Sequence, residues 1–236
     1  MVISLSGWIR CVGKSVPVCT LLLAGCTPFH LSDLRSTSTV KAKSLDVAGL
    51  AGDPLATFPA IAPQALQGYG PAVSQALSAA LAEITPPFHE IPPHETLNRL
   101  NEQGLAQEYT EMVSDFVRGG IFDRTRLEKI GSAVGSQYIL QPGVGDFRET
   151  LADRFMLGGW RVVKTRAATL RLWLRLWDTK SGKIVWESIG EATVTSELLE
   201  DMPTIPVHTI AQRLWSGMVQ EHLLGEKTTV GSTLRE

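Results

Sequence analysis

The stretch of sequence that decides the fold is LRLWLRLW, residues 170–177. Leucine occupies every second position from Leu170 to Leu176, and arginine or tryptophan occupies the positions between them. A period of two is typical of a β-strand that presents one buried face. The stretch therefore predicts a central strand whose leucines lie in the core.

A second strand is predicted directly after the first. Residues 178–183 (DTKSGK) have the composition of a turn, because Asp178 can hydrogen-bond its own backbone and Gly182 is free to adopt a positive φ. Residues 184–189 (IVWESI) contain the β-branched and aromatic residues that strands favour. We therefore expect a long hairpin over residues 168–195.

The rest of the chain predicts helices and strands in the order β-α-β-α-α-α-β-β-β-α. Strands are expected at residues 55–58, 88–91 and 137–147, and helices at 71–84, through Leu97 and Leu100, at 109–117, 127–134 and 207–218. Residues 149–167 carry mixed charges and are predicted to be an exposed excursion before the hairpin. This order predicts one α/β domain, a mixed β-sheet flanked by helices.

The composition is that of an ordinary globular protein. The chain has 236 residues, of which 44% are hydrophobic and 19% charged, so a substantial core can form. The formal net charge is −2, although the only charges in the first 25 residues are Arg10 and Lys14. The remainder is therefore mildly acidic, which gives no electrostatic reason to expect nucleic acid as a partner.

The amino-terminal residues have the pattern of an export signal. A basic start is followed by an apolar run over residues 16–24, which is too short to span a membrane. The run ends in LAGC, residues 23–26, which resembles the lipobox of bacterial lipoproteins. That resemblance implies cleavage between Gly25 and Cys26 and attachment of lipid to Cys26. The alternative is a chance LAGC in a plain signal peptide or a buried helix.

These features predict four segments. Residues 1–25 form the lipoprotein signal peptide, 26–52 a flexible tether from the lipidated Cys26, 53–224 the α/β domain and 225–236 a disordered tail. The lipid would anchor the chain in the membrane. The resemblance to enterobacterial lipoproteins implies that an aspartate directly after the lipidated cysteine would retain the chain in the inner membrane. Thr27 stands there instead, which favours the outer membrane with the domain facing the periplasm.

Two stretches together resemble a known family. Residues 127–147 followed by residues 174–185 (LRLWDTKSGKIV) are similar to exported lipoproteins that include the curli-secretion component CsgG, LpoB-type activators of penicillin-binding proteins and relatives with the fold of the TolB amino-terminal domain. The similarity extends over residues 55–224. Pro142 in the middle strand and the short first strand depart from the pattern, which puts the pairing of strands there in question.

No stretch of the sequence predicts a reaction. In HEIPPHE, residues 89–95, the histidines are five apart and Pro92 and Pro93 interrupt a helix, whereas a zinc-protease helix needs histidines four apart. Gly143-Val144-Gly145 lacks the third glycine of a dinucleotide-binding loop and favours a strand bulge. Asp146, Glu149 and Asp153 are interpreted as a solvated loop face. We therefore expect a non-enzymatic protein with no catalytic residue, cofactor or metal.

One feature of the hairpin suggests binding. The arginines and tryptophans share a face, with a candidate neighbour on the returning strand, and both residue types are enriched at interaction hot spots. The set consists of Arg171, Trp173, Arg175, Trp177 and Trp186. The alternative interpretation is that a second layer of helices covers this face and the arginines lie at its rim.

The leading hypothesis from the sequence is a lipid-anchored periplasmic binding or assembly factor whose partner is another envelope protein. The alternative, which the resemblance to CsgG implies, is a subunit of an oligomeric outer-membrane secretion channel. A channel needs amphipathic hairpins with strands of about 9–11 residues. The only room for them is residues 149–167, where Arg154, Arg161, Lys164 and Arg166 interrupt an apolar pattern. The sequence leaves the oligomeric state open.

Overall fold

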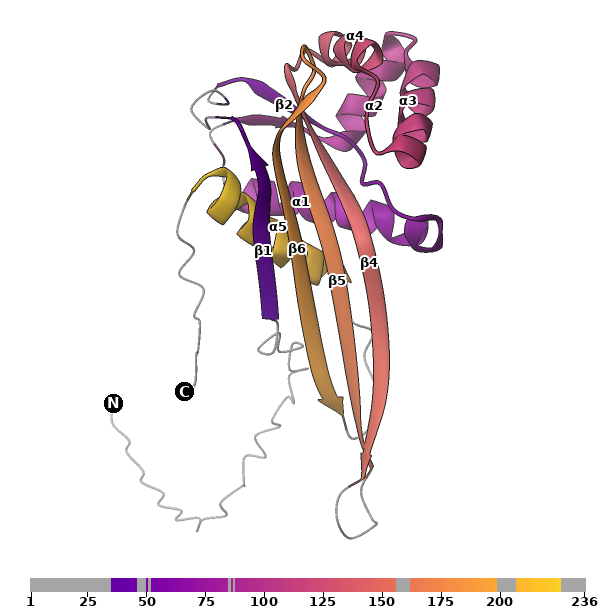
Figure 1. Cartoon of the computed structure of the whole chain (residues 1–236), viewed down its shortest axis with the longest axis vertical. Helices are drawn as coiled ribbons and strands as arrows, with labels where there is room; N and C mark the ends of the chain where they lie inside the picture. Colours follow the sequence, from indigo (N-terminus) through magenta and orange to yellow (C-terminus); the bar gives the residue numbers. More distant parts are fainter. Residues whose placement is uncertain are drawn as a thin grey trace, which may run out of the picture. The chain divides into compact units, whose positions relative to one another are not determined.

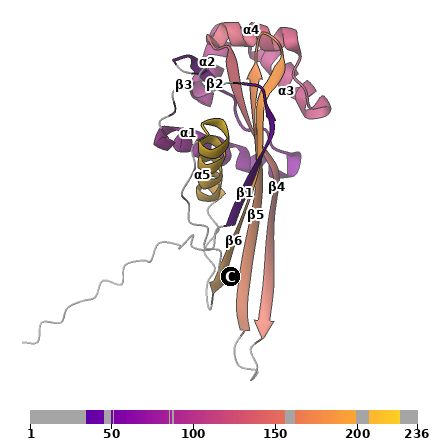
Figure 2. The same cartoon turned by 60° about the vertical axis from the view of Figure 1, so that its left-hand side comes forward.

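The computed structural model describes residues 35–45, 50, 52–84, 86, 88–155, 162–198 and 207–225. These residues form a six-stranded mixed sheet with helices packed on both faces (Figures 1 and 2). The predicted α/β class and its single mixed sheet are therefore confirmed.

The strands are ordered β1-β6-β5-β4-β2-β3 across the sheet. Their bounds are Arg35–Lys43 (β1), Pro54–Thr57 (β2), His89–Ile91 (β3), Tyr138–Phe155 (β4), Val162–Asp178 (β5) and Lys183–Leu198 (β6). Neighbours from β1 to β4 are antiparallel, whereas β2 pairs in parallel with both β4 and β3. The short first strand predicted from the sequence is β2, and it does pair with β3 and β4, over three residues in each case.

Three long strands dominate the sheet, and their far ends extend past α1 and α5 (Figure 1). β4 has 18 residues and pairs with β5 as far as Phe155 with Val162. The prediction of an exposed excursion over residues 149–167 was therefore wrong, because most of that segment continues the two strands. The side chains of this segment are mostly polar, so it lacks the apolar alternation that identifies a strand in a sequence. Arg166, for example, forms an ion pair with Glu149 of the neighbouring strand at 2.6 Å.

Pro142 lies inside β4 without interrupting it. The carbonyl of Pro142 accepts a hydrogen bond from the backbone N–H of Ile61 at 3.1 Å, on the side of the strand that faces β2. β2 has already ended at Thr57, so the missing N–H of the proline leaves no ladder partner unsatisfied. The bulge that the glycines predicted is present at Gly145, between Val144 and Asp146.

The leucine face of the hairpin is buried beneath α1 (Gly70–Ile84), α5 (Val207–Gly217) and the π-helical turn η4 (Met218–Leu223). The 3-10 turn η3 (Gln64–Tyr69) leads into α1. Gly190 on β6 lets α5 come close, because a Cβ there would lie 2.7 Å from Leu214 and Met218. The indole of Trp215 donates to the carbonyl of Val73 at 3.2 Å and joins α5 to α1.

Among the described residues, the other face is covered at one end only, near the β5–β6 turn, by α2 (Pro93–Glu102), α3 (Ala106–Gly119) and α4 (Arg124–Val134) (Figures 1 and 2). Asp123 caps α4 by accepting a hydrogen bond from the N–H of Arg126 at 2.9 Å, and Gly135 ends it at φ 74°. At the hairpin turn, Gly182 has φ 69° and Asp178 accepts from the N–H of Lys180 at 3.0 Å, as predicted.

β1 corrects the predicted segment boundaries. The sequence assigned residues 26–52 to a flexible tether, but Arg35–Lys43 pairs with β6 as an edge strand of the sheet. Its residues are mostly Ser, Thr and Lys with exposed side chains, so no apolar period signalled a strand. Residues 1–34 and 226–236, which include the predicted signal peptide and nearly all of the predicted tail, lie outside the described residues.

Candidate interaction surface

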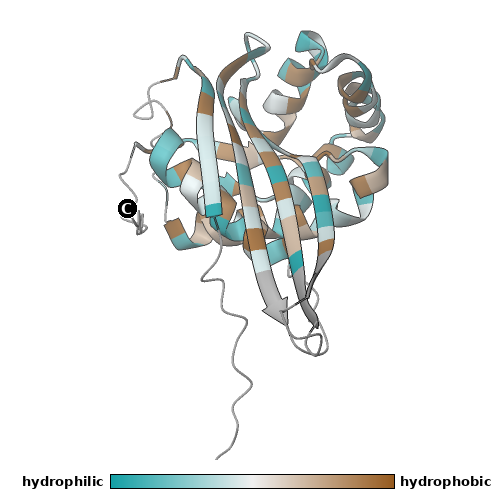
Figure 3. Cartoon of the chain, turned by 60° about the horizontal axis from the view of Figure 1, so that its bottom comes forward, coloured by the Kyte–Doolittle hydropathy of each residue, from teal (hydrophilic) through white to brown (hydrophobic). Residues whose placement is uncertain are grey.

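The two faces of β5 have different surroundings. Leu170, Leu172, Leu174 and Leu176 all have no exposed side-chain area, as the alternation predicted. The residues between them point to the opposite face, where coverage by α3 and α4 ends part of the way along the strand. Figure 3 shows the resulting alternation of hydrophilic and hydrophobic residues along the long strands.

Trp177 is a core residue, which corrects its assignment to an interaction face. Its exposed fraction is 1%, and its ring lies 4.9 Å from that of Phe122 and 6.3 Å from that of Phe116, centroid to centroid. The physical reason is its position at the end of the strand, beneath α3 and the loop that follows it. The alternative interpretation, burial under a helical layer, holds at this position.

Trp186 also falls outside the predicted face. It is fully buried, and its register partner is Leu176, so it lies on the leucine face of the sheet. Its indole Nε1 donates to the carbonyl of His222 in η4 at 3.2 Å. A register shift between Leu176 and Trp177 sets this orientation, because one extra residue reverses the faces of the strand that follows.

The remaining predicted residues lie together where the helical cover of this face ends, with Trp173 and Arg175 beside Phe116 of α3. We call this surface the open face. It consists of Arg171, Trp173 and Arg175 on β5, Glu187, Ile189 and Glu191 on β6, and Thr37 and Thr39 on β1. The sequence did not predict the β1 and β6 members. The sequence did contain a pattern that predicts the β6 members, because the glutamates at 187 and 191 have the same four-residue spacing as the arginines at 171 and 175 on the facing strand.

Arg175 is held by three contacts at the edge of the helical cover. Its guanidinium lies 4.8 Å from the ring centroid of Trp173 and 5.8 Å from that of Phe116. Its Nε donates to Glu187 Oε1 at 2.6 Å, and 25% of its side chain remains exposed. A stacked, ion-paired arginine of this kind is rigid before any partner arrives, so less entropy is lost on binding.

Arg171 lies further from the helices and is more accessible. It contacts Glu191 at 2.6 Å, and 54% of its side chain is exposed. An exposed pair of this kind contributes at most about 1 kcal/mol to stability. The open face therefore places a half-buried tryptophan between two arginines, each matched by a glutamate, so its charges are balanced.

Trp173 rests on a glycine of the neighbouring strand. Gly143 is its register partner, and a Cβ built on Gly143 would lie 2.0 Å from atoms of the indole ring. The glycine pair 143 and 145 thus has two structural roles, as a platform for Trp173 and as a bulge. Neither residue belongs to a dinucleotide loop.

This contact yields a prediction about the open face. Gly143→Ala should destabilise the fold by about 1–3 kcal/mol, because the indole of Trp173 must leave its position. Gly145→Ala is the matched control, since its Cβ would meet Arg171 no closer than 3.4 Å. Thermal unfolding of both variants measures the difference. Equal melting temperatures for Gly143→Ala and the wild type would contradict the stacked geometry.

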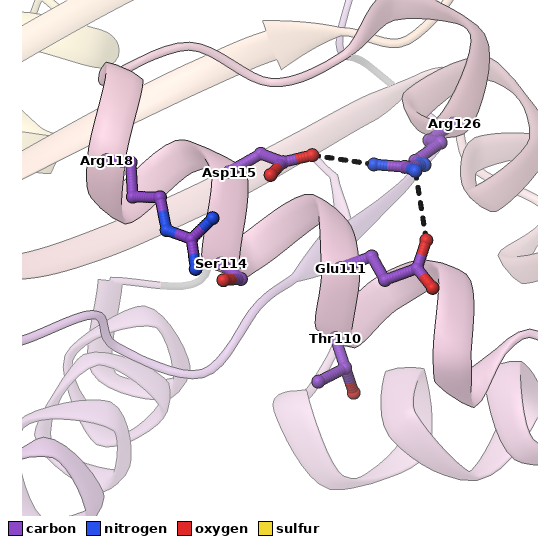
Figure 4. Close-up of a pocket in the computed structure, with 6 residues that line it drawn as sticks. All are labelled: Thr110, Glu111, Ser114, Asp115, Arg118 and Arg126. Carbon is purple, nitrogen blue, oxygen red and sulfur yellow. Dashed lines mark hydrogen bonds and ion pairs between the residues drawn. The ribbon is translucent and has the colours of Figure 1, made fainter.

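Apart from the open face, a polar hollow lies between helices α3 and α4 (Figure 4). Arg126 points at two carboxylates there, contacting Glu111 at 2.9 Å and Asp115 at 2.8 Å. Nearby, the ammonium of Lys129 lowers the pKa of Glu108. These charges already satisfy one another, and the hollow has a polar lining that offers no apolar anchor for a ligand.

The HEIPPHE stretch divides into an edge strand and a helix start. Pro93 opens α2, and Glu90 accepts a hydrogen bond from the hydroxyl of Ser78 at 3.0 Å. Burial raises the pKa of Glu90. Within the part of the chain that the structure describes, no group of three or more His, Cys, Asp or Glu residues could hold a metal ion.

The carboxylates proposed as a loop face are ion-paired where their side chains are described. Asp146 contacts Arg148 at 2.7 Å, and Glu149 contacts Arg166.

Gly25 and Cys26 lie outside the described residues, so lipidation of Cys26 stays a prediction. Among the described residues, no helix is long and apolar enough to cross a membrane.

Comparison with protein-family models finds no match, and comparison with curated proteins finds none either. Several solved structures are similar. PelC, a dodecamer from Paraburkholderia phytofirmans, is 13% identical with a TM-score of 0.40, over 78% of this chain and 95% of that one. Lipoprotein GNA1162 from Neisseria meningitidis is 16% identical with a TM-score of 0.40, over 73% and 99%.

The LpoB C-terminal domain from Salmonella enterica is 14% identical with a TM-score of 0.37, over 68% of this chain and 89% of that one. The similar structures thus include a lipoprotein and a domain from the LpoB branch of the family that the sequence resembles. The resemblances to CsgG and to the TolB domain stay predictions. At TM-scores below 0.5, none of these similarities carries an argument about what this chain binds.

Proposed function

We propose that this chain is a lipid-anchored protein of the bacterial cell envelope that binds another envelope protein through the open face and catalyses no reaction. The signal pattern and LAGC before residue 27 support export and anchoring. The outer membrane, on its periplasmic side, is the location that Thr27 favours.

The observation that carries the proposal is the place on the sheet where the helical cover ends. Helices bury Trp177 on this face, Trp173 is half-buried at their edge with its ring 6.0 Å from that of Phe116, and Arg171 further along the same strand is exposed. Tryptophan and arginine are the residues most enriched at hot spots of protein interfaces. Because the sheet and the Arg175 stack are rigid, the surface needs little reorganisation to bind a folded partner.

The surface is better suited to protein binding than to catalysis. Its titratable side chains form cross-strand pairs, Arg175 with Glu187 and Arg171 with Glu191, rather than a nucleophile with a base. Balanced charge around an aromatic centre is the composition of an interface core with its rim.

The secretion-channel alternative gains one observation, the length of the strands. β4 and β5 have 18 and 17 residues, which exceeds the span of about 9–11 that a membrane strand needs. Polar residues argue against it. Arg148, Glu149 and Thr150 are all exposed in succession on β4, where a lipid-facing strand would alternate with apolar residues. We therefore keep it as the second candidate.

Cys26→Ser tests the anchor. The variant should leave the membrane fraction or remain unprocessed, because the acyl chains that the lipobox resemblance implies are its only anchor in this proposal, and two such chains suffice for stable attachment. Fractionation of cells followed by immunoblotting measures the outcome. A processed Cys26→Ser chain that still sediments with the outer membrane would contradict lipid anchoring and favour the channel.

Arg171→Ala tests the surface. We expect capture of the envelope partner to weaken by more than about 1 kcal/mol, whereas the melting temperature should hardly change because the ion pair is exposed. Arg126→Ala is the matched control, an ion-paired arginine on α4 away from the open face. Pull-down from detergent-solubilised membranes measures capture. Equal capture by both variants would contradict the proposed surface.

A further inference from the structure

We propose that copies of this chain associate edge to edge. The β1 strand of one copy adds to the part of β4 that follows the bulge at Gly145 in the next copy, which we call the lower half of β4, and so continues the sheet. This goes beyond the proposed function, because it concerns a different surface, the sheet edges, and a second copy of the chain as the occupant.

The lower half of β4 has an unpaired edge. Alternate residues of a strand direct their N–H and C=O groups away from one neighbour and toward the other. Pro142 and Val144 direct theirs to Ile61, and the bulge at Gly145 then shifts the alternation by one residue. The next outward residues are 147, 149 and 151, whose backbone groups have no partner among the described residues.

β1 offers a matching edge on the other side of the sheet. The N–H of Ser44 donates to the carbonyl of Val185, so Ser44 faces β6. Facing residues alternate along β1, and the register shift between Val40 and Ala42 changes the alternation by one residue. The backbone groups of residues 36, 38 and 40 therefore point away from β6. Their backbone groups likewise have no partner among the described residues.

The two edges fit in direction, pleat and register. Because each neighbouring pair from β1 to β4 is antiparallel, β1 and β4 run in opposite directions and would pair antiparallel. The outward residues of both strands lie on the helix-covered side of the sheet: Ser38 contacts His222 at 2.7 Å, and Phe147 stacks on Tyr69 at 4.9 Å. A continuous sheet requires this agreement of faces.

Apolar exposure marks the same edges. Val40 on β1 is 37% exposed and Leu151 on β4 is 68% exposed. In one register Val40 would face Phe147 of the next copy and Ser36 would face Leu151, which covers both apolar side chains. Lys41 and Lys43 then stop the ladder, as charged residues and a bulge do at protected sheet edges. The contact is heterologous, so each added copy leaves a new free edge.

A cysteine pair tests this register. Thr37 and Thr150 would be directly opposed across the contact, but within one chain they lie three strand spacings apart, roughly 14 Å or more, too far for a disulfide. The full chain carrying both Thr37→Cys and Thr150→Cys should form dimers and larger species on oxidation that a reductant dissolves. Each single variant alone should form no interchain disulfide, and a mixture of the two should form disulfide-linked dimers but no larger covalent species. Absence of interchain disulfides in the folded double variant would overturn the proposal.

A second pair of variants avoids any dependence on disulfide chemistry. Leu151→Pro removes an N–H that points away from β5, so the internal ladder is kept. Leu151→Ala is the control that retains the N–H. In sedimentation velocity of the detergent-solubilised full chain, Leu151→Pro should weaken self-association by about tenfold relative to Leu151→Ala. A wild-type chain that stays monomeric throughout, or a Leu151→Pro chain that associates as the wild type does, would overturn the proposal.

Discussion

Trp177→Ala is expected to lower the free energy of unfolding by about 3–5 kcal/mol, one of the two largest effects predicted for a single substitution in this chain. The indole is 1% exposed and contacts Phe116 and Phe122 beneath α3. Its removal leaves a cavity that β5 and the helices cannot close, since both elements are held by other contacts. Denaturant unfolding followed by circular dichroism measures the loss.

Trp177→Phe is the informative control. The indole N–H has no hydrogen-bond partner among the described residues, so phenylalanine gives up no bond and keeps most of the ring contacts. We expect Trp177→Phe to lose much less than Trp177→Ala, about 1.5 kcal/mol or less. If Trp177→Ala itself changed stability by under about 1 kcal/mol, the assignment of this residue to the core would be wrong.

Leu174→Ala is expected to cost about 2–5 kcal/mol, because Leu174 is fully buried at the centre of the leucine face under α1 and α5. Leu151→Ala on the adjacent strand is the matched control, with a side chain that is 68% exposed, and should change stability by no more than about 0.5 kcal/mol. Parallel thermal melts compare the two. Similar effects at both positions would contradict the assigned faces of the sheet.

Much of the fold was predictable because its signals are local. Strict alternation at residues 170–177 predicted the buried face, and glycine with aspartate at 178–182 predicted the turn. Capping by Asp123 and termination at Gly135 likewise follow from backbone chemistry within a few residues. These features need no information about distant partners, so one sequence suffices.

The parts that were wrong depend on pairing with distant residues. β1 consists of polar residues whose only reason to be extended is the free edge of β6. Residues 149–155 and 162–167 form strands because they pair with each other, with polar residues such as Arg166 and Glu149 in contact. Neither segment has an apolar period, so neither carried a sequence signal for a strand.

The candidate site was half predictable for the same reason. The shared face of Arg171, Trp173 and Arg175 follows from their spacing on one strand. Whether helices cover that face depends on where α3 ends, and the side of the sheet on which Trp186 lies depends on one register shift after the turn. Trp177 and Trp186 are therefore core residues, whereas Trp173 lies beside Arg175 on the open face.

The central claim is that the open face binds an envelope protein, and photo-cross-linking in intact cells tests it most directly. A photoreactive residue in place of the exposed Thr39 on the open face, and another in place of the exposed Glu128 on α4, would be compared in the otherwise unaltered full chain, which keeps Arg171 and Trp173. We predict that position 39 cross-links to one defined envelope protein, identified by mass spectrometry, and that position 128 does not. Cross-linking of such a partner from position 128 while position 39 yields none would contradict the account.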